Sequence, residues 1–286
     1  MKINAVDRAR VLAHALPNIQ RYSNKTIVIK YGGNAMIDED LKKNVINDVV
    51  LLNTIGIRVV LVHGGGPGID AMLKKLNIQP KFVNGLRVTD EETMDVVQMV
   101  LSGQLNKSLV SMISQAGSTA VGVCGMDAHL IKAEKLDEEH GYVGKVIEIN
   151  DKLITDLLDN GYIPVIASTG VDENNHAYNI NADLAASAIA TKLKAENLVL
   201  VSNIPGLLED KNDEDSLLSE VTLSQIEDLK ERGVIAGGMI PKIDCCKEAI
   251  ENGVKQAVII DGRVPHSLLI EMLTNEGIGT MIIGDK

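Results

Sequence analysis

Short apolar segments alternate with segments of helical periodicity along most of this 286-residue chain. The apolar segments are rich in β-branched residues, are bounded by turn residues and carry no polar face. Such segments are typical of parallel strands that helices cover on both sides. The predicted strands are Thr26–Lys30, Arg58–Val62, Thr119–Val123, Ile163–Ala167, Leu198–Ser202 and Gln256–Ile260.

The segments between these strands predict helices, and strand–helix alternation predicts an α/β fold with right-handed crossovers. In such sheets ligands bind beyond the carboxyl ends of the strands, so we expect the loops there to carry the chemistry. The predicted helices are Asp40–Thr54, Gly68–Leu76, Asp90–Gln115, Lys152–Asn160, Ala182–Leu193, Leu223–Arg232, Pro241–Asn252 and His266–Leu273.

Two segments depart from this alternation, and two further features concern the organisation of the chain. Leu130–Lys135 and Tyr142–Ile149 alternate apolar and polar residues around a charged turn, which predicts a half-exposed antiparallel hairpin. Near Leu193–Asn197 one strand–helix series ends and another begins, so we place a boundary between two lobes there. Apolar residues recur at helical spacing from Ile3 to Leu16, which predicts an amphipathic helix that ends at Pro17.

The composition excludes several classes of protein. The net charge is −11 and Trp is absent, so the chain lacks the basic surface and the stacking platforms of a nucleic-acid binder. No segment approaches the ~20 apolar residues of a membrane span, and the amino end lacks the apolar core of a secretory signal. Cys124, Cys245 and Cys246 suit neither a disulfide framework nor a zinc site, so we expect free thiols in a cytoplasmic protein.

Two glycine-rich loops follow predicted strands. Lys30 ends the first strand, and Gly32 and Gly33 come directly after it. The segment Gly64–Gly68 holds four glycines in five residues after the second strand. Glycine lets backbone N–H groups approach an anion, and a lysine adds a point charge that suits phosphate. The alternative for both loops is a tight structural turn.

The second glycine-rich loop fits none of three common catalytic motifs. Ile69 stands where a dinucleotide-binding loop needs its last glycine, and the chain has no Walker loop. His63–Gly66 resembles an esterase oxyanion hole, but the required G-x-S-x-G nucleophile turn is absent. We therefore expect His63 to orient the turn rather than act as a base, and the loop to cradle an anion at a helix start.

Polar side chains gather at two further helix starts. Arg87 lies just before a start that Thr89 and Glu92 mark by capping-box spacing, and a guanidinium suits a carboxylate or a phosphate. Tyr178–Asp183 opens an Ala-rich helix with three amide or carboxylate side chains, more than one helix cap requires. The alternatives are a surface arginine and simple helix capping.

A last glycine loop places a lysine where it is electrostatically unfavourable. Gly237 and Gly238 precede a helix, and Lys242 lies at the positive end of that helix unless an anion binds nearby. The alternative is a solvated lysine that tolerates the small penalty. Together, two lysines, glycine loops, an arginine and one aspartate, without a nucleophile or a histidine base, fit phosphoryl transfer.

These motifs resemble the amino acid kinase family, and within it the acetylglutamate kinase branch. The resemblance covers nearly the whole chain, from about Thr26 to Ile283, and the motifs occur in family order. It implies a three-layer αβα sandwich with an open, mainly parallel central sheet and two lobes. The motifs are Ile29–Gly33, Val62–Pro67, Asn84–Thr89, Tyr178–Asp183 and Gly237–Lys242, of which the third and fourth distinguish this branch from relatives that phosphorylate carbamate, uridylate or aspartate.

The resemblance implies ATP-dependent phosphorylation of the side-chain carboxylate of N-acetyl-L-glutamate, the second step of arginine biosynthesis. It implies that Mg²⁺ is held mainly by nucleotide phosphates and water, with no metal ligand from the protein. Residues 1–22 would form an oligomerisation helix. Residues 23–195 would form a lobe for N-acetylglutamate, and residues 196–286 a lobe for ATP.

The resemblance also implies a role for each motif. Lys30 and Lys242 would stabilise the transferring phosphoryl group, and Asp183 would orient both lysines. The substrate-binding residues would be Gly65, Gly66, Arg87, Asn179 and Asn181. The nucleotide-binding residues would be Gly32, Gly33, Asn203, Gly206, Leu208, Gly237 and Gly238, although the family usually carries aspartate where this chain has Asn203.

Arginine-inhibited members of the branch have a similar N-terminal helix, which joins dimers into a hexamer. We therefore expect a homo-oligomer with a dimeric core, a hexamer, and feedback inhibition by arginine through His266, Glu276 and Gly279. One alternative is a kinase that acts on carbamate or aspartate. Another is a catalytically silent amino-acid sensor, against which the intact lysines and aspartate argue.

Overall fold

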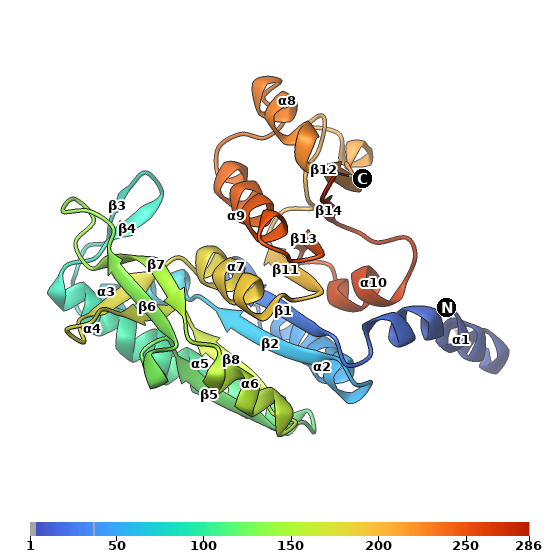
Figure 1. Ribbon diagram of the computed structural model, residues 1–286, viewed down its shortest axis with the longest axis horizontal. Coiled ribbons are helices and arrows are strands. Elements are labelled where there is room, and N and C mark those ends of the chain that lie inside the picture. Colours follow the sequence, from blue (N-terminus) through green and yellow to red (C-terminus); the bar gives the residue numbers. More distant parts are fainter. Residues whose placement is uncertain (1–3, 37, 286) are drawn as a thin grey trace.

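The computed structural model describes residues 4–36 and 38–285, and an eight-stranded sheet organises them (Figure 1). Across this sheet the strands are β12 (Glu220–Thr222), β14 (Thr280–Ile283), β13 (Gln256–Asp261), β11 (Asn197–Ser202), β1 (Thr26–Tyr31), β2 (Arg58–His63), β8 (Ile163–Ala167) and β5 (Ala120–Cys124). Every neighbouring pair is parallel except β14 and β13. The six predicted strands are confirmed to within one residue at each end.

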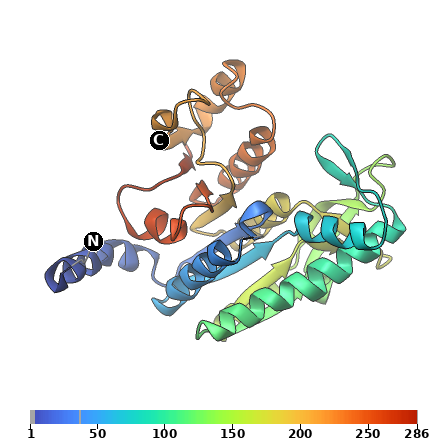
Figure 2. The same ribbon diagram turned by 180° about the vertical axis from the view of Figure 1, so that it is seen from behind.

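Helices cover both faces of the sheet, because successive side chains of a buried strand point to opposite sides. Val28 belongs to a buried cluster with α6 (Lys152–Asp159), α7 (Ala182–Leu193), α8 (Ile226–Glu231) and α9 (Met239–Glu251). Ile27 and Ile29 belong to another with α2 (Glu39–Thr54), α5 (Asn106–Gln115) and α10 (Ser267–Leu273), on the face seen in Figure 2. The predicted three-layer αβα sandwich is confirmed. The sheet is continuous across the predicted lobe boundary, since β1 and β11 pair directly.

The predicted helix over Asp90–Gln115 is confirmed as a continuous helical segment from Glu91, but its type changes in the middle. The chain forms α4 (Glu91–Gln98), then a π-helical segment at Met99–Leu105, then α5. The wider π turns bring Leu101 and Leu105 against the same glycine, Gly65. Hydrophobic periodicity alone does not separate a π turn from an α turn.

The predicted hairpin belongs to a small closed barrel. Its strands are β6 (Ile131–Lys135), β7 (Val143–Ile149), β9 (Thr169–Val171) and β10 (Ala177–Ile180). β6 and β7 pair antiparallel, as predicted. The sequence analysis missed β9 and β10, since strands of three and four residues are too short to display a clear alternation.

A separate hairpin, β3 (Lys81–Val83) and β4 (Leu86–Val88), stands apart from both sheets. Its turn residues Asn84 and Gly85 both have positive φ, 49° and 80°, as a tight two-residue hairpin turn requires. The helix after it is capped by Asp90, which accepts from the backbone N–H of Thr93. The predicted Thr89 cap is therefore wrong by one residue.

Two helices begin two residues earlier than predicted. α3 (Gly66–Lys75) includes the last part of the glycine loop, and α9 begins at Met239 rather than at Pro241. Lys242 remains at the amino-terminal end of α9, so the electrostatic argument for it holds. The predicted helix Leu223–Arg232 begins as a 3-10 turn before α8.

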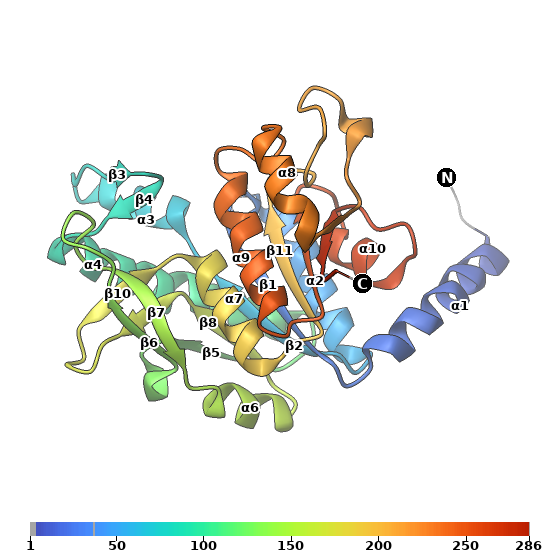
Figure 3. The ribbon, with the colours of Figure 1, turned by 45° about the horizontal axis from the view of Figure 1, so that its top comes forward.

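The N-terminal helix α1 (Ala5–Tyr22) runs through Pro17, so its predicted end is wrong. Tyr22 is buried and anchors the last turn. Ile3, where the predicted periodicity begins, lies outside the described residues. Figure 3 shows α1 extending away from the rest of the fold. Among the helices of the described residues, none is long and apolar enough to cross a membrane.

Candidate active site

Three charged side chains from distant parts of the chain meet beyond the carboxyl ends of the central strands. Lys30 comes from β1, Asp183 from the first turn of α7 and Lys242 from the start of α9. The Nζ of Lys30 lies 2.9 Å from Oδ1 of Asp183, and the Nζ of Lys242 lies 2.6 Å from Oδ2. One carboxylate thus holds two ammonium groups side by side.

This cluster is largely enclosed by protein. The side chains of Lys30, Asp183 and Lys242 are 11%, 13% and 18% exposed. Burial alone would raise the pKa of Asp183, but the two neighbouring ammonium groups outweigh it and hold that pKa below its ordinary 3.8. Asp183 is therefore ionised at neutral pH. The cluster carries one uncompensated positive charge and suits an anion.

The cluster lies between two cavities. Lys30 and Asp183 line the first, of about 230 Å³, and Lys242 lines the second, of about 510 Å³. The second has the size of an ordinary small-molecule site, and the first suits a smaller ligand. Because Asp183 contacts both lysines, the two cavities meet at their ammonium groups.

The second glycine-rich loop forms one wall of the first cavity. Gly64, Gly65 and Gly66 all line it. A Cβ at Gly65 would lie 2.6 Å from Cδ2 of Leu101, and a Cβ at Gly64 would lie 3.1 Å from Cβ of Ala182, whereas Gly66 has open space around it. Gly65 is therefore required by packing, and Gly66 begins α3 with backbone N–H groups free for a ligand.

Arg87 lines the same cavity and is 8% exposed. Its Nη2 lies 2.7 Å from Oδ1 of Asp70, and its guanidinium carbon lies 4.7 Å from the ring centre of Phe82. Its Nη1 is buried and has no hydrogen-bond partner among the described residues. A buried donor without an acceptor is costly, so the cavity offers a place for an acceptor. The sequence analysis missed Asp70 and Phe82, because nothing in the sequence marks these contacts.

The two predicted asparagines occupy different positions. Asn179 lines the first cavity and donates to Oγ1 of Thr89 at 3.2 Å. Asn181 also lines it, but its side chain accepts from the backbone N–H of Asp183 at 2.8 Å and caps α7. Capping therefore accounts for Asn181. Ser168 lines the cavity as well and was not predicted as a site residue.

The predicted nucleotide-binding residues divide between the two cavities. Gly32 and Gly33 line the first cavity, beside Lys30. Asn203, Gly206, Leu208 and Gly238 line the second, and Gly237 is not among its lining residues. The second cavity also contains Lys211 and Arg263, which the sequence analysis missed. Its lining has three basic side chains against one acidic side chain, Glu214, which suits an anionic ligand.

His63 is buried behind the glycine loop, not exposed in it. Its Nδ1 lies 2.9 Å from the carbonyl oxygen of Gly64, and its Nε2 lies 3.1 Å from Nδ2 of Asn106. Burial lowers the pKa of His63 to about 4, so the ring is neutral at pH 7. Its Nδ1–H then donates to Gly64 and its Nε2 accepts from Asn106. This geometry suits the predicted orienting role and not that of a base.

The three residues expected to bind arginine have different surroundings in the structure. Nδ1 of His266 lies 2.6 Å from Oδ1 of Asp48. Glu276 lines a cavity between α1 and α10, and neither His266 nor Gly279 lines it. Gly279 instead donates its backbone N–H to Glu271.

Residues 25–261 of this chain match the model of the amino acid kinase family. The acetylglutamate kinase of Clostridium kluyveri is 55% identical over 282 residues, which cover 98% of this chain and 100% of the relative. The acetylglutamate kinase of Clostridium beijerinckii is 53% identical over 283 residues, which cover 98% and 99%.

Solved structures share the fold. The structure of smu.665 from Streptococcus mutans UA159 superposes with a TM-score of 0.75 at 33% identity, over 91% of this chain and 99% of that one. N-acetylglutamate synthase from Neisseria gonorrhoeae, in complex with coenzyme A and N-acetyl-glutamate, gives a TM-score of 0.86 at 24% identity. That match covers 97% of this chain and 64% of the synthase, and at this identity it shows the fold alone.

Proposed function

Because this chain belongs to the amino acid kinase family, we propose that it transfers the terminal phosphoryl group of ATP to the side-chain carboxylate of N-acetyl-L-glutamate. The products are N-acetyl-L-glutamyl 5-phosphate and ADP, and the step is the second of arginine biosynthesis. Acetylglutamate kinases that are 55% and 53% identical over nearly the whole chain support this substrate.

The observation that carries the proposal is the position of the Lys30–Asp183–Lys242 cluster between two cavities. The acyl acceptor occupies the first cavity, and the nucleotide occupies the second with its phosphates toward Lys242. A phosphoryl group that passes from one ligand to the other then crosses the space beside both ammonium groups. Asp183 keeps the two lysines together while the site is empty.

The reaction requires neutralisation of negative charge rather than a general base. A carboxylate acceptor with an ordinary pKa of about 4.3 is already ionised at pH 7. Its approach to the nucleotide phosphates is opposed by about 4 kcal/mol for each pair of unit charges ~4 Å apart, at an effective dielectric near 20. Lys30 and Lys242 offset this repulsion most strongly as charge develops on the transferring group.

The remaining residues of the first cavity bind and orient the acceptor. Backbone N–H groups of Gly65 and Gly66 donate to the reacting carboxylate at the start of α3. Arg87 holds the second carboxylate through its unpaired Nη1, and Asn179 lies on the same wall. Two carboxylates separated by a short chain match a cavity with cationic groups at Lys30 and Arg87.

The nucleotide and its metal ion belong to the second cavity. Asn203, Gly206, Leu208 and Gly238 contact ATP, and Gly32 and Gly33 lie along the phosphate path. No group of three His, Cys, Asp or Glu side chains gathers within residues 4–36 and 38–285. Asp183, the acidic residue of the cluster, is already bound to both lysines. Mg²⁺ would be held mainly by the phosphates of ATP and by water, where it would neutralise phosphate charge.

We extend the proposal to organisation and regulation. Residues 23–195 form the acceptor lobe, residues 196–286 form the nucleotide lobe, and the enzyme works in the cytoplasm as a homo-oligomer with arginine as its inhibitor. The cavity between α1 and α10, which Glu276 lines, is the place for arginine. His266 and Gly279 act there only indirectly, because neither lines it.

A panel of acceptors tests the proposed reaction. The purified chain is given Mg-ATP with N-acetylglutamate, glutamate, aspartate or carbamate, and ADP release is measured while hydroxylamine traps an acyl phosphate. We expect N-acetylglutamate to give the highest kcat/KM and a hydroxamate product. Hydroxamate formed faster from aspartate, or ADP release with carbamate alone, contradicts the substrate assignment.

A further inference from the structure

The β3–β4 hairpin lines part of the first cavity, but it is not stabilised by pairing with a larger sheet. Phe82, Gly85, Leu86 and Arg87 all line that cavity. The hairpin is a two-stranded sheet that pairs with no other strand of the described residues. A two-stranded hairpin is marginally stable by itself. Its position over the cavity therefore depends on contacts with neighbouring segments.

The base of the hairpin is attached through the backbone. The N–H of Thr89 donates to the carbonyl of His140 at 3.0 Å, and the N–H of Tyr142 donates to the carbonyl of Thr89 at 2.6 Å. The hydroxyl of Thr89 donates to the carbonyl of Arg87 at 2.9 Å. These bonds hold residue 89, which follows β4, and leave the turn at residues 84–85 unsupported.

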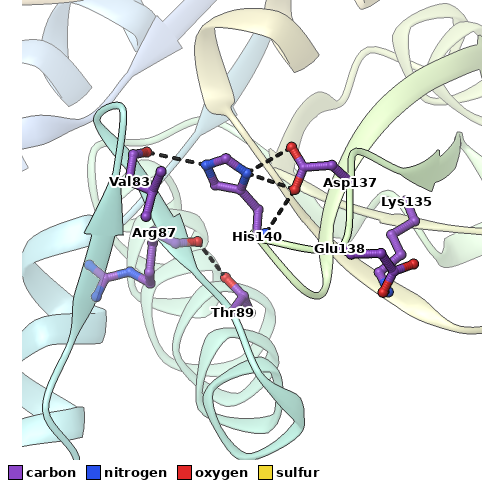
Figure 4. Close-up of polar contacts among 7 residues, drawn as sticks. All are labelled: Val83, Arg87, Thr89, Lys135, Asp137, Glu138 and His140. Atoms are coloured by element: carbon purple, nitrogen blue, oxygen red, sulfur yellow. Dashed lines mark hydrogen bonds and ion pairs between the residues drawn. The ribbon is translucent and has the colours of Figure 1, made fainter.

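Near the turn, the His140 ring provides a second attachment (Figure 4). This residue lies in the loop between β6 and β7 and is 4% exposed. Its Nε2 lies 3.2 Å from the carbonyl oxygen of Val83, which immediately precedes the turn. Its Nδ1 lies 2.8 Å and 2.9 Å from the two carboxylate oxygens of Asp137. One imidazole thus connects the barrel loop to the hairpin.

Both partners of this ring can only accept hydrogen bonds, because one is a carbonyl and the other a carboxylate. A neutral imidazole has one N–H and can donate to only one of these two acceptors. The lone pair of its other nitrogen would then face the lone pair of the second acceptor. The imidazolium has two N–H groups and serves both. When the ring is neutral, the charge-assisted bond to Asp137 is the stronger, so the bond to Val83 is lost.

The charged groups around the ring favour the imidazolium. The hydrogen bond to Asp137 is the largest cause that raises the pKa of His140 above its ordinary 6.5, and the negative charge of Glu139 adds to it. Lys135 and Glu138 on the same loop pair with each other at 2.6 Å. On the hairpin, Arg87 points away from the ring (Figure 4) and pairs with Asp70.

We propose that the His140 imidazolium is a positioning group that holds the β3–β4 hairpin, and with it Arg87, over the acceptor cavity. The proposal rests on the proposed function, in which Arg87 binds the acceptor. Since the folded pKa of His140 is raised, the attachment is complete below about pH 6.5 and is lost as the pH rises through the higher folded value. Acceptor binding weakens over the same pH range.

Steady-state kinetics between about pH 6 and about pH 9 test this role, because neither carboxylate of the acceptor titrates there. In the wild type, the KM for N-acetylglutamate should rise with pH while the KM for Mg-ATP stays nearly constant. In His140→Gln, both N–H groups sit on one nitrogen, which cannot take the places of the two ring nitrogens that face Asp137 and Val83. Its KM for N-acetylglutamate should be raised roughly tenfold at low pH and no longer depend on pH, with kcat changed less than about twofold.

Two further variants separate the role of His140 from a general effect. Asp137→Asn removes the charge that favours the imidazolium, so the rise in KM should begin at a lower pH. His176→Gln is the matched control: Nδ1 of His176 also pairs with an aspartate, Asp172, at 3.0 Å, but His176 lies in the turn between β9 and β10. This control should keep the wild-type profile.

A wild-type KM that is flat with pH overturns the proposal, as does a His140→Gln profile equal to that of the wild type. If His140→Gln does not fold, nitrogen NMR of histidine-labelled wild type decides, with the His140 signal assigned by its shift in Asp137→Asn. A His140 ring that keeps both nitrogens protonated to a higher pH in the wild type than in Asp137→Asn supports the proposal, and a ring that is already neutral below pH 6.5 overturns it. A folded wild type that does not turn over N-acetylglutamate at any pH contradicts the proposed function instead, and the NMR result still stands.

Discussion

At the scale of single residues, Asp183 explains why two lysines can share one small site. Two ammonium groups in a largely enclosed space repel each other. A carboxylate between them offsets this repulsion, because it forms an ion pair with each of them. The arrangement also leaves each ammonium free to reach an incoming anion on its open side. Each lysine is thus held in place before any ligand binds.

This arrangement predicts the effect of removing either lysine. Lys30→Ala or Lys242→Ala should lower kcat by roughly 10²–10³-fold, because each group stabilises charge that develops in the transition state. Initial rates of ADP release measure this, and circular dichroism should display an intact fold. Lys132→Ala is the control, since Lys132 forms an exposed ion pair with Glu148 and lines neither ligand cavity. Near-normal turnover of both active-site variants would contradict the account.

Some of these residues could be predicted from the sequence and others could not. Lys242 was found because a lysine at a helix N-terminus is locally unfavourable, and Lys30 because a strand end and two glycines frame it. No comparable feature of the sequence distinguishes Asp70. Its contact with Arg87 joins α3 to the hairpin, and only the packing of these elements brings the two side chains together.

At the scale of elements, the π-helical segment and the glycine loop form one unit. Leu101 and Leu105 of the segment would contact any side chain at Gly65, and Asn106 directly after it holds the ring of His63. His63 in turn donates to the carbonyl of Gly64. The loop is therefore fixed from behind, and the N–H of Gly64 also donates to the carbonyl of Tyr31 at 3.2 Å.

Neighbouring glycines of this loop should respond differently to the same substitution. Gly65→Ala should lower the free energy of unfolding by about 1–3 kcal/mol, because its Cβ would overlap Leu101. Gly66→Ala should change it by less than about 0.5 kcal/mol, because the position has open space. Urea denaturation of both variants measures the difference. Equal stabilities would show that the π-helical segment does not pack against the loop as described.

Six of the eight strands of the central sheet were predictable for a physical reason, and β12 and β14 were missed. Five of the six are buried on both faces, so their composition differs sharply from that of the neighbouring helices, while β5 at the edge is half-buried. β9 and β10 are short, and the π-helical segment keeps a helical pattern of apolar residues. Their geometry depends on contacts made elsewhere, with Gly65 for the segment and with β6 and β7 for the strands.

At the scale of the whole molecule, α1 presents exposed apolar side chains. Val6, Val11, Leu12 and Leu16 are between 51% and 73% exposed. Figure 1 shows the helix projecting beside α10, away from the sheet. An exposed apolar face of this size on an ordered helix suggests that another copy of the chain covers it.

Deletion of the residues before Pro17 should reduce a hexamer to dimers, because it removes that apolar face and keeps the buried anchor at Tyr22. Light scattering coupled to gel filtration measures the mass. Activity should persist, since the deleted residues lie outside both ligand cavities. A truncated chain that elutes with the mass of the full-length oligomer would contradict this role for α1.

The central claim is that two lysines from distant parts of the chain act on one phosphoryl group. A crystal structure with Mg-ADP, N-acetylglutamate and aluminium fluoride as a mimic of the transferring group tests it most directly. We predict that the Nζ atoms of Lys30 and Lys242 both lie within hydrogen-bond distance of the fluoride, on opposite sides. A fluoride contacted by one lysine alone, with the other still bound only to Asp183, would contradict the account.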